Sequence, residues 1–252
     1  MRKIYSLMVL TRQQFQHYLD QGYALGGPLL EGRELAELRR RMDEAIARLP
    51  AGQRSEHMPS LHYEDPWFRE LFLSRGFVDI AEQILGPDVA LFVSYAISKR
   101  PQDGLPVAWH QDAAFFPIEP MRTFTLWLAV DDSDRDNGCM QVVRGSHLAK
   151  QALPHVVDQS GETVLAIQLP QNSFGKTVDV EMRAGCYSVH DPYLIHGSAP
   201  NRSPRRRCGI TIKYVPTSIR LERGFRSPTG FDWRDVRLYH ARGARGALEY
   251  AN

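Results

Sequence analysis

Two hydrophobic periods divide the chain near residue 87. Before that point, apolar residues recur every three or four positions, which is the helical period. The pattern predicts one helix over 12–20, capped by Thr11, and a second over 34–49. A third helix is expected over 67–85, with Gly76 as a candidate break. The first third of the chain is therefore expected to be helical.

After residue 87 the chain becomes a series of short apolar runs separated by Gly, Pro, Asp and Asn. Many short strands without helices between them are typical of a sandwich or barrel. We expect one mainly β domain, with a helical part at 1–87, a β core at 88–216 and an irregular C-terminal cover at 217–252. The candidate strands are 89–99, 123–130, 141–144, 177–181, 186–190 and 208–215.

Composition excludes several classes of protein. The 252 residues are 43% hydrophobic and 24% charged, as in ordinary globular proteins, and the net charge of +2 favours neither nucleic acid nor an anionic membrane as a partner. Three widely spaced cysteines predict no disulfide framework. The apolar run near the N-terminus is too short to span a membrane and lacks a cleavage signature. We expect a cytoplasmic protein, monomeric or homodimeric, without nucleic-acid or membrane partners.

The segment Trp109-His110-Gln111-Asp112 places an imidazole and a carboxylate two residues apart. In an extended chain such residues point to the same side, so both can reach one metal ion. A distant histidine would complete the two-His, one-carboxylate triad of non-haem Fe(II) oxygenases. His196 and His190 both qualify. An HxD pair alone is weak evidence, since a surface turn gives it too, and a single histidine is more often structural than a ligand.

Several segments between about residues 90 and 215 follow one another in the order typical of a known family. As a set they resemble the phytanoyl-CoA dioxygenase family of 2-oxoglutarate oxygenases. The segments are Trp109-His110-Gln111-Asp112, then Leu126-Trp127-Leu-Ala-Val-Asp-Asp, Asn137-Gly138 and Gly145-Ser146-His147, then His196-Gly-Ser198 with Asn201, Ser203 and Arg207.

The resemblance implies a double-stranded β-helix, a cupin-like jelly roll with flanking N-terminal helices. It also implies Fe(II), 2-oxoglutarate as cosubstrate, and dioxygen. By motif, the metal ligands are His110, Asp112 and His196, and Arg207 forms the salt bridge to the distal carboxylate of 2-oxoglutarate. The further positions that resemble cosubstrate contacts are Ser198, Thr125, Trp127 and Gln111.

Strand periodicity agrees with these assignments without proving them. Alternation puts Thr125 and Trp127 on one face of their run, and it puts Arg207 and Lys213 on one face of theirs. A mixed face suits a barrel lumen that holds a dicarboxylate, but a sheet with one solvated face gives the same pattern. A guanidinium can grip a carboxylate with two parallel hydrogen bonds. Spacing favours Arg207 over its neighbours.

The family chemistry converts 2-oxoglutarate to succinate and carbon dioxide while a substrate C–H bond is oxidised. Halogenating relatives lack the carboxylate ligand, so Asp112 argues for hydroxylation, desaturation or oxidative cyclisation. Two other classes stay open: a cupin-type metal-dependent isomerase or hydrolase that does not use 2-oxoglutarate, and a non-catalytic binding jelly roll.

The substrate pocket is expected between Phe115 and Phe116, which follow the HxD segment, and a loop that carries His57 and His62. Phenylalanines are as often plain core residues, so both interpretations of that pair stand. No segment resembles a patch for the phosphates of coenzyme A. We therefore favour a small-molecule substrate from secondary metabolism.

Overall fold

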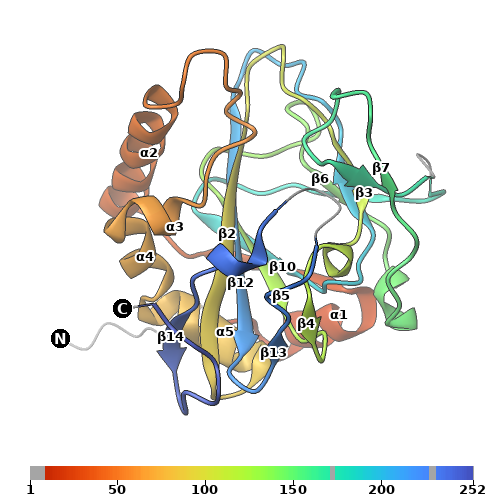
Figure 1. The fold of residues 1–252 in the computed structure, drawn as a ribbon. Helices are drawn as coiled ribbons and strands as arrows, with labels where there is room; N and C mark the ends of the chain where they lie inside the picture. The colour runs from red at the N-terminus through yellow and green to blue at the C-terminus, as the bar shows by residue number, and fades with distance from the viewer. Residues whose placement is uncertain (1–8, 171–173, 227–230, 252) are drawn as a thin grey trace.

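The computed structural model describes residues 9–170, 174–226 and 231–251. Two antiparallel sheets form the centre, and helices cover the outer side of the larger one; Figure 1 shows α2, α3 and α4 on one side of β2, with β3 and β6 on the other. The helices are α1 (Arg12–Gln21), α2 (Gly32–Ala47), α3 (Leu61–Glu64), α4 (Pro66–Phe72) and α5 (Arg75–Leu85), with 3-10 turns η1 (Asp112–Ala114), η2 (Ser146–Ala149) and η3 (Trp233–Asp235).

The large sheet has six strands in the order β1-β10-β5-β12-β2-β14. Its register sets rows of residues side by side: Arg207 lies opposite Lys99, and Thr125 lies between His190 and Lys213. Both rows contribute side chains to the candidate active site. The strands are β1 (Tyr23–Pro28), β10 (Cys186–His190), β5 (Phe124–Ala129), β12 (Arg207–Pro216), β2 (Val89–Lys99) and β14 (Tyr239–Arg242).

The small sheet has four strands in the order β3-β11-β6-β9, and it pairs His196 directly with His110. Two further ribbons are formed by β13 with β4 and by β7 with β8. The strands are β3 (Val107–His110), β11 (His196–Ser198), β6 (Met140–Val142), β9 (Val178–Val180), β13 (Arg220–Leu221), β4 (Ile118–Glu119), β7 (Val156–Val157) and β8 (Ile167–Gln168).

The main hydrophobic core lies between the large sheet and the helices. Alternation along β5 sends Leu126 and Leu128 into this core, together with Ile210 of β12, and all three are fully buried. Each such side chain contributes roughly 1.5–3 kcal/mol by leaving water. The opposite face of the same strands turns towards the small sheet. Two antiparallel sheets with a lumen between them are the jelly roll that the family resemblance implies.

The helices match the expected pattern except at one break. Thr11 and Gln14 form a capping box at α1, so that helix begins where the sequence predicts. The third expected helix is divided in two, but the break falls at Leu73–Ser74 and not at Gly76. Ser74 is the N-cap of α5, and Gly76 lies inside its first turn.

Both ends of the chain contain strands that the sequence does not predict. The N-terminal part is not wholly helical, because β1 joins the large sheet beside β10. Gly26 of β1 lies where a Cβ would come within 2.1 Å of the Tyr187 ring, and this glycine-containing segment has no clear strand period. The described part of the C-terminal cover is irregular over most of its length, as expected, but β14 pairs with β2 and β13 pairs with β4.

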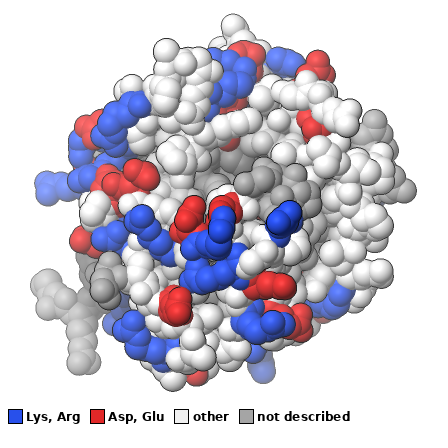
Figure 2. Space-filling view, in the orientation of Figure 1, with Lys and Arg blue, Asp and Glu red and all other residues white. Residues whose placement is uncertain are grey.

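The outer surface of the protein carries both signs of charge. Figure 2 shows Lys and Arg mixed with Asp and Glu over the face drawn, as the net charge of +2 suggests. Among the described residues, no helix is both long and apolar enough to cross a membrane. Most of the N-terminal apolar run, residues 4–10, lies outside the described residues.

Candidate active site

The three residues of the expected triad come together between the sheets. His110 ends β3, His196 begins β11, and Asp112 opens η1. One potential ligand atom from each lies within 4.8 Å of the others, and all three residues are buried. A Cβ at Gly197 would lie 3.0 Å from the Val107 carbonyl oxygen, so this glycine lets β11 approach β3 closely.

Backbone carbonyls orient both histidines. His110 Nδ1 donates to the Ala108 carbonyl at 2.8 Å, and His196 Nδ1 donates to the Leu194 carbonyl at 2.9 Å. Because a carbonyl only accepts, each Nδ1 carries the proton and each Nε2 keeps its lone pair for a metal. Burial lowers the pKa of His110 to about 4 and holds the pKa of His196 well below its usual range. Both rings are therefore neutral near pH 7, the form that binds metal ions.

Three side chains contact one oxygen of the Asp112 carboxylate, Oδ2. Thr125 donates its hydroxyl to Asp112 Oδ2 at 2.5 Å, His190 Nε2 lies 3.3 Å away, and Lys213 Nζ lies 3.4 Å away. Burial alone would raise the pKa of Asp112, but Lys213 and the nearby histidines hold it well below the usual range. The carboxylate is therefore ionised, and its Oδ1 lies towards His110, 3.9 Å from Nε2.

This donor set fits a divalent iron ion. Two neutral imidazoles and one carboxylate are the ligands of mononuclear non-haem Fe(II) sites, which keep further coordination positions open. Here the three residues line a cavity that leaves room for such positions. His190, the competing histidine, lines the same cavity with its ring centre 4.4 Å from that of His196. The group of close ligand atoms contains His196 rather than His190. The proposed iron ligands are therefore His110, Asp112 and His196.

A second cluster of polar groups lies where β2 and β12 pair. Arg207 and Lys99 face each other across the strands, and both donate to the Ser198 hydroxyl, at 3.3 Å from Arg207 Nη2 and 2.7 Å from Lys99 Nζ. We call these three residues the cation cradle. Within the described part of the chain, neither Lys99 nor Arg207 forms an ion pair with an acidic side chain. Lys99 Nζ also donates to the Ala199 carbonyl, whereas Arg207 Nε has no hydrogen-bond partner.

Burial makes the cation cradle a site for an anion. It lowers the pKa of Lys99 to about 5, with Arg207 adding to the effect, and it lowers the pKa of Arg207 to about 10. Near pH 7 Lys99 is therefore uncharged while the site is empty, whereas Arg207 keeps its charge. A buried charge without a counter-ion is costly, so an anionic group that lies against Arg207 would be bound strongly and would favour protonation of Lys99. A carboxylate matches the fork of a guanidinium. Lys99, which the sequence analysis missed, is thus a candidate partner of Arg207.

Trp127 forms the cavity wall beside the cradle. Its ring lies 5.6 Å from the guanidinium carbon of Arg207. The indole packs on β12 where a Cβ at Gly209 would come within 2.1 Å of it, so only glycine leaves room there. Trp127 and Ser198 both line the cavity, as expected of cosubstrate contacts.

Two expected cosubstrate contacts have other partners. The Gln111 side chain donates to the carbonyls of Tyr193 and Gln151 and accepts from Leu153 N, so it ties loops together on the far side of the segment. Alternation explains this, because Gln111 lies between His110 and Asp112 and must point away from them. Thr125 is on the lumen face as expected, but its hydroxyl holds Asp112 instead of lining the cavity.

The triad and two cradle residues, Arg207 and Ser198, line a cavity of about 390 Å³ whose walls are mostly apolar. His57, Phe115 and Phe116 line it, as the sequence analysis expected of substrate contacts. Lys213, which alternation puts on the same face of its strand as Arg207, also lines it. Other apolar lining residues are Met58, Val107, Leu165, Phe231 and Trp233.

The expectation that His62 lines this pocket is wrong. Its segment is the short helix α3, not a loop, and the ring is fully buried behind β2. His62 Nδ1 lies 2.6 Å from Ser94 Oγ, and the ring packs against Tyr63 and Tyr239. Burial lowers the pKa of His62 to about 3, so the side chain is a neutral core residue.

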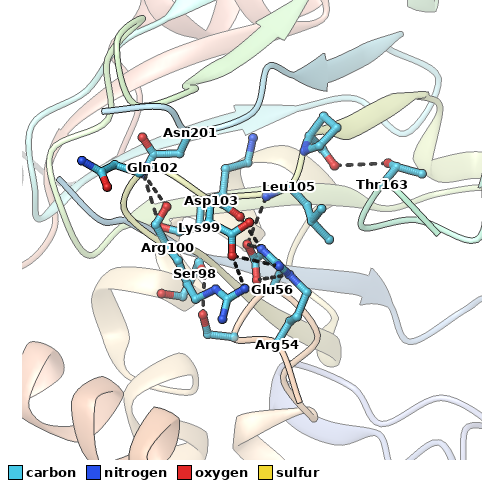
Figure 3. Close-up of polar contacts among 12 residues, drawn as sticks. Arg54, Glu56, Ser98, Lys99, Arg100, Gln102, Asp103, Leu105, Thr163 and Asn201 are labelled. Atoms are coloured by element: carbon cyan, nitrogen blue, oxygen red, sulfur yellow. Dashed lines mark hydrogen bonds and ion pairs between the residues drawn. The ribbon is translucent and has the colours of Figure 1, made fainter. Parts of the chain in front are cut away.

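Glu56 is an acidic lining residue that the sequence analysis also missed. Arg54 pairs with both of its oxygens, at 2.9 and 3.2 Å, and Leu105 N donates to one of them (Figure 3). Arg54 also reaches Asp103 on the turn after β2. This network ties the loop before α3 to the turn after β2, and Arg54 balances the negative charge of Glu56.

Comparisons with known proteins agree with this geometry. The family described as phytanoyl-CoA dioxygenase (PhyH) matches residues 18–209. A probable alpha-ketoglutarate-dependent hypophosphite dioxygenase of Stutzerimonas stutzeri is 32% identical over 151 residues, 58% of this chain and 51% of that protein. A phytanoyl-CoA dioxygenase of Arabidopsis thaliana is 30% identical over 158 residues, 62% of this chain and 55% of the relative.

Solved structures share the fold. The non-heme monooxygenase ThoJ superposes with a TM-score of 0.74 at 23% identity, over 94% of this chain and 86% of ThoJ. The epimerase SnoN, solved with Fe³⁺, alpha ketoglutarate and nogalamycin RO, gives a TM-score of 0.70 at 22% identity, over 92% of this chain and 96% of SnoN. The matched stretch spans about half the length of the curated relatives. Since the family match covers most of the chain, this protein belongs to the phytanoyl-CoA dioxygenase family.

Proposed function

We propose that this protein is a non-haem Fe(II), 2-oxoglutarate-dependent dioxygenase that oxidises a small molecule. The observation that carries the proposal is one cavity that the triad lines together with Arg207 and Ser198 of the cradle. A metal triad alone would serve many reactions. A metal triad in one cavity with a buried arginine that lacks an acidic partner fits a dicarboxylate that binds the metal at one end and the cradle at the other.

Each part of the site has a defined task in this proposal. His110, Asp112 and His196 hold the iron, and Thr125 fixes the carboxylate ligand. The cation cradle binds the distal carboxylate of 2-oxoglutarate, with Trp127 as the adjoining wall. Iron with 2-oxoglutarate and dioxygen supplies the oxidising power, and the cosubstrate leaves as succinate and carbon dioxide. The apolar walls orient the substrate and exclude water.

The cavity suits a compact substrate. Its volume of about 390 Å³ lies at the small end of ordinary ligand sites, and its walls include Phe115 and Phe116. We propose a secondary metabolite rather than a long acyl chain, and an oxidation by hydroxylation, desaturation or cyclisation. The description of SnoN, solved with nogalamycin RO, and that of the hypophosphite dioxygenase relative support small-molecule chemistry in this fold.

The cupin-type alternative predicts a different use of the cradle. A hydrolase or isomerase that uses its metal as a Lewis acid needs no second anion site, so Lys99 and Arg207 would have no partner. The paired cations therefore favour the oxygenase.

A turnover assay tests this function. Purified protein is reconstituted with Fe(II) and given 2-oxoglutarate in air, and succinate is measured with and without a panel of candidate substrates. We expect succinate release that requires iron, stops with His196→Ala, and is stimulated by a true substrate. Iron-independent release, or full activity of His196→Ala, would contradict the assignment.

A further inference from the structure

A further buried basic side chain, Lys213, lines the cavity at a distance from the cradle. Lys213 lies on β12 six residues beyond Arg207 and on the same face, which is about 20 Å along an extended strand. Its side chain is 4% exposed, and its ammonium nitrogen lies 5.4 Å from the ring centre of Phe116. Lys213 therefore belongs to the part of the cavity next to the metal triad and its aromatic wall, away from the cradle.

The contacts of Lys213 leave hydrogen-bond donors unused. His190, Thr125 and Lys213 form one row across β10, β5 and β12, and all three approach Asp112 Oδ2. Thr125 makes the short contact at 2.5 Å, whereas Lys213 lies 3.4 Å away. In the described part of the chain this carboxylate is its only polar contact, yet an ammonium group has three donors. Positioning Asp112 uses only part of that capacity.

The balance of charge around the cavity also favours an anionic ligand. Arg207 and Lys213 are the buried basic residues that line the cavity, and among the described residues its lining acids are Asp112 and Glu56. Glu56 is already neutralised by Arg54 (Figure 3). Fe(II) and 2-oxoglutarate carry equal and opposite charges, so loading the site leaves a positive excess. Unbalanced buried charge is costly, and an anionic substrate would remove part of that cost.

We propose that Lys213 binds an oxyanion group of the substrate, such as a carboxylate or a phosphonate, against the face of Phe116 and beside the metal. This inference rests on the proposed function, because it assigns metal and cosubstrate to the other polar groups. Since the anion is anchored next to the metal ligand Asp112, the bond that is oxidised lies close to the anionic group. The substrate class is then a small acid with an apolar or aromatic body that fits the remaining walls.

Binding of matched probes tests the role of Lys213 without turnover. Protein loaded with Zn(II) and 2-oxoglutarate is titrated calorimetrically with 3-phenylpropionate and 3-phenylpropanamide, and with phenylphosphonate and benzyl alcohol. We expect wild type to prefer the anionic member of at least one pair by about ten- to a hundredfold, as a charge-assisted hydrogen bond predicts. Lys213→Met should remove the preference and leave the affinity for the neutral member unchanged.

Two controls separate an effect of Lys213 on the probe from an effect on metal or cosubstrate binding. Lys150→Met removes a lysine whose side chain is 56% exposed and pairs with Asp191, so this variant should keep the preference. Affinities for Zn(II) and 2-oxoglutarate are measured first for every variant. Equal wild-type affinity within both pairs, or a preference that survives Lys213→Met, would overturn the inference. Loss of metal or 2-oxoglutarate affinity alone in Lys213→Met would do so too, and would make Lys213 a positioning residue for Asp112. Wild type that binds neither metal nor 2-oxoglutarate would instead refute the proposed function.

Discussion

The two faces of the large sheet differ in chemistry although adjacent residues of the same strands form them. Towards the helices, β5 presents Leu126 and Leu128, and β12 presents Ile210, all fully buried in an apolar core. Towards the small sheet, the same strands present Thr125 and Lys213, which surround a buried carboxylate. On the helix face the apolar side chains are fully packed. On the lumen face some hydrogen-bond donors, such as those of Lys213, have no partner among the described residues.

This difference separates stability from function within single strands. Burial of apolar area on the helix face stabilises the fold, whereas buried cations on the lumen face cost stability until an anion binds. Changes on the two faces should therefore have different consequences, even one residue apart. The predictions below compare the faces, beginning with the largest effect.

Loss of a triad histidine should abolish function while the helix face keeps the protein folded. Even residues outside the metal's ligand set change metal affinity by about 10–100-fold, so His110→Ala or His196→Ala should cost at least that and end succinate release. The comparison variant is His190→Ala, which changes a neighbouring histidine outside the triad. His190 lies 3.3 Å from Asp112 Oδ2, so this variant should weaken metal binding by no more than about 10–100-fold and keep some succinate release. Circular dichroism checks folding. A dead His190→Ala beside an active His196→Ala would reassign the distal ligand.

Adjacent substitutions on β5 should separate the faces. Leu126→Ala should lower the free energy of unfolding by about 2–5 kcal/mol, as expected for a buried leucine, with 2-oxoglutarate affinity unchanged. Thr125→Val should keep most of the stability and weaken metal binding about 10–100-fold, because Asp112 loses its short hydrogen bond. Urea unfolding and metal titration measure the two effects. Equal behaviour of both variants would refute the separation.

Loss of the cradle arginine should act on the cosubstrate alone. Arg207→Ala should raise the 2-oxoglutarate concentration needed for half-maximal turnover about ten- to a hundredfold. Arg205 and Arg206, which pair with Asp134 and Asp131 on the outside, are controls expected to change it little. If all three substitutions weaken 2-oxoglutarate equally, the basic cluster acts diffusely and the cradle assignment is wrong.

His62 should make the helix side sensitive to acid. Its pKa is about 3 in the folded protein and ordinarily 6.5, so below pH 6.5 the unfolded chain takes up a proton that the folded chain refuses. The free energy of unfolding therefore falls as the pH drops from 6.5 towards 3, by about 2 kcal/mol at pH 5. His62→Leu should lose this contribution. Urea unfolding at several pH values measures the free energy of unfolding of both proteins. If the two profiles run parallel, His62 takes up its proton in the folded protein as readily as in the unfolded chain, and the prediction is wrong.

Features that depend on short-range pattern could be predicted from the sequence. The alternation in β12 and the HxD spacing are local, and the expected metal ligands do lie together. Lys99 was missed because its importance comes from the register that sets it opposite Arg207, which no local pattern shows. β1 was missed because Gly26 and Gly27 interrupt any strand period.

Side-chain direction explains the remaining differences. The family resemblance predicts a cosubstrate contact at Gln111, although alternation points this side chain away from its neighbours His110 and Asp112. The sequence predicts a loop at His62, but this segment forms a helical turn whose inner side is the core. Conversely, strand period predicts correctly which residues of β5 and β12 share a face, whereas it does not decide that this face lines a lumen.

The most direct test of the central claim is an anaerobic titration of the Fe(II)-loaded protein with 2-oxoglutarate, followed by visible absorption. The account predicts a charge-transfer band that saturates at one 2-oxoglutarate per iron, because the triad leaves positions open for a chelating ligand. The band should be absent with His196→Ala and should need more 2-oxoglutarate with Arg207→Ala. A wild-type protein that binds iron but gives no band, or binds 2-oxoglutarate equally well without metal, would contradict the account.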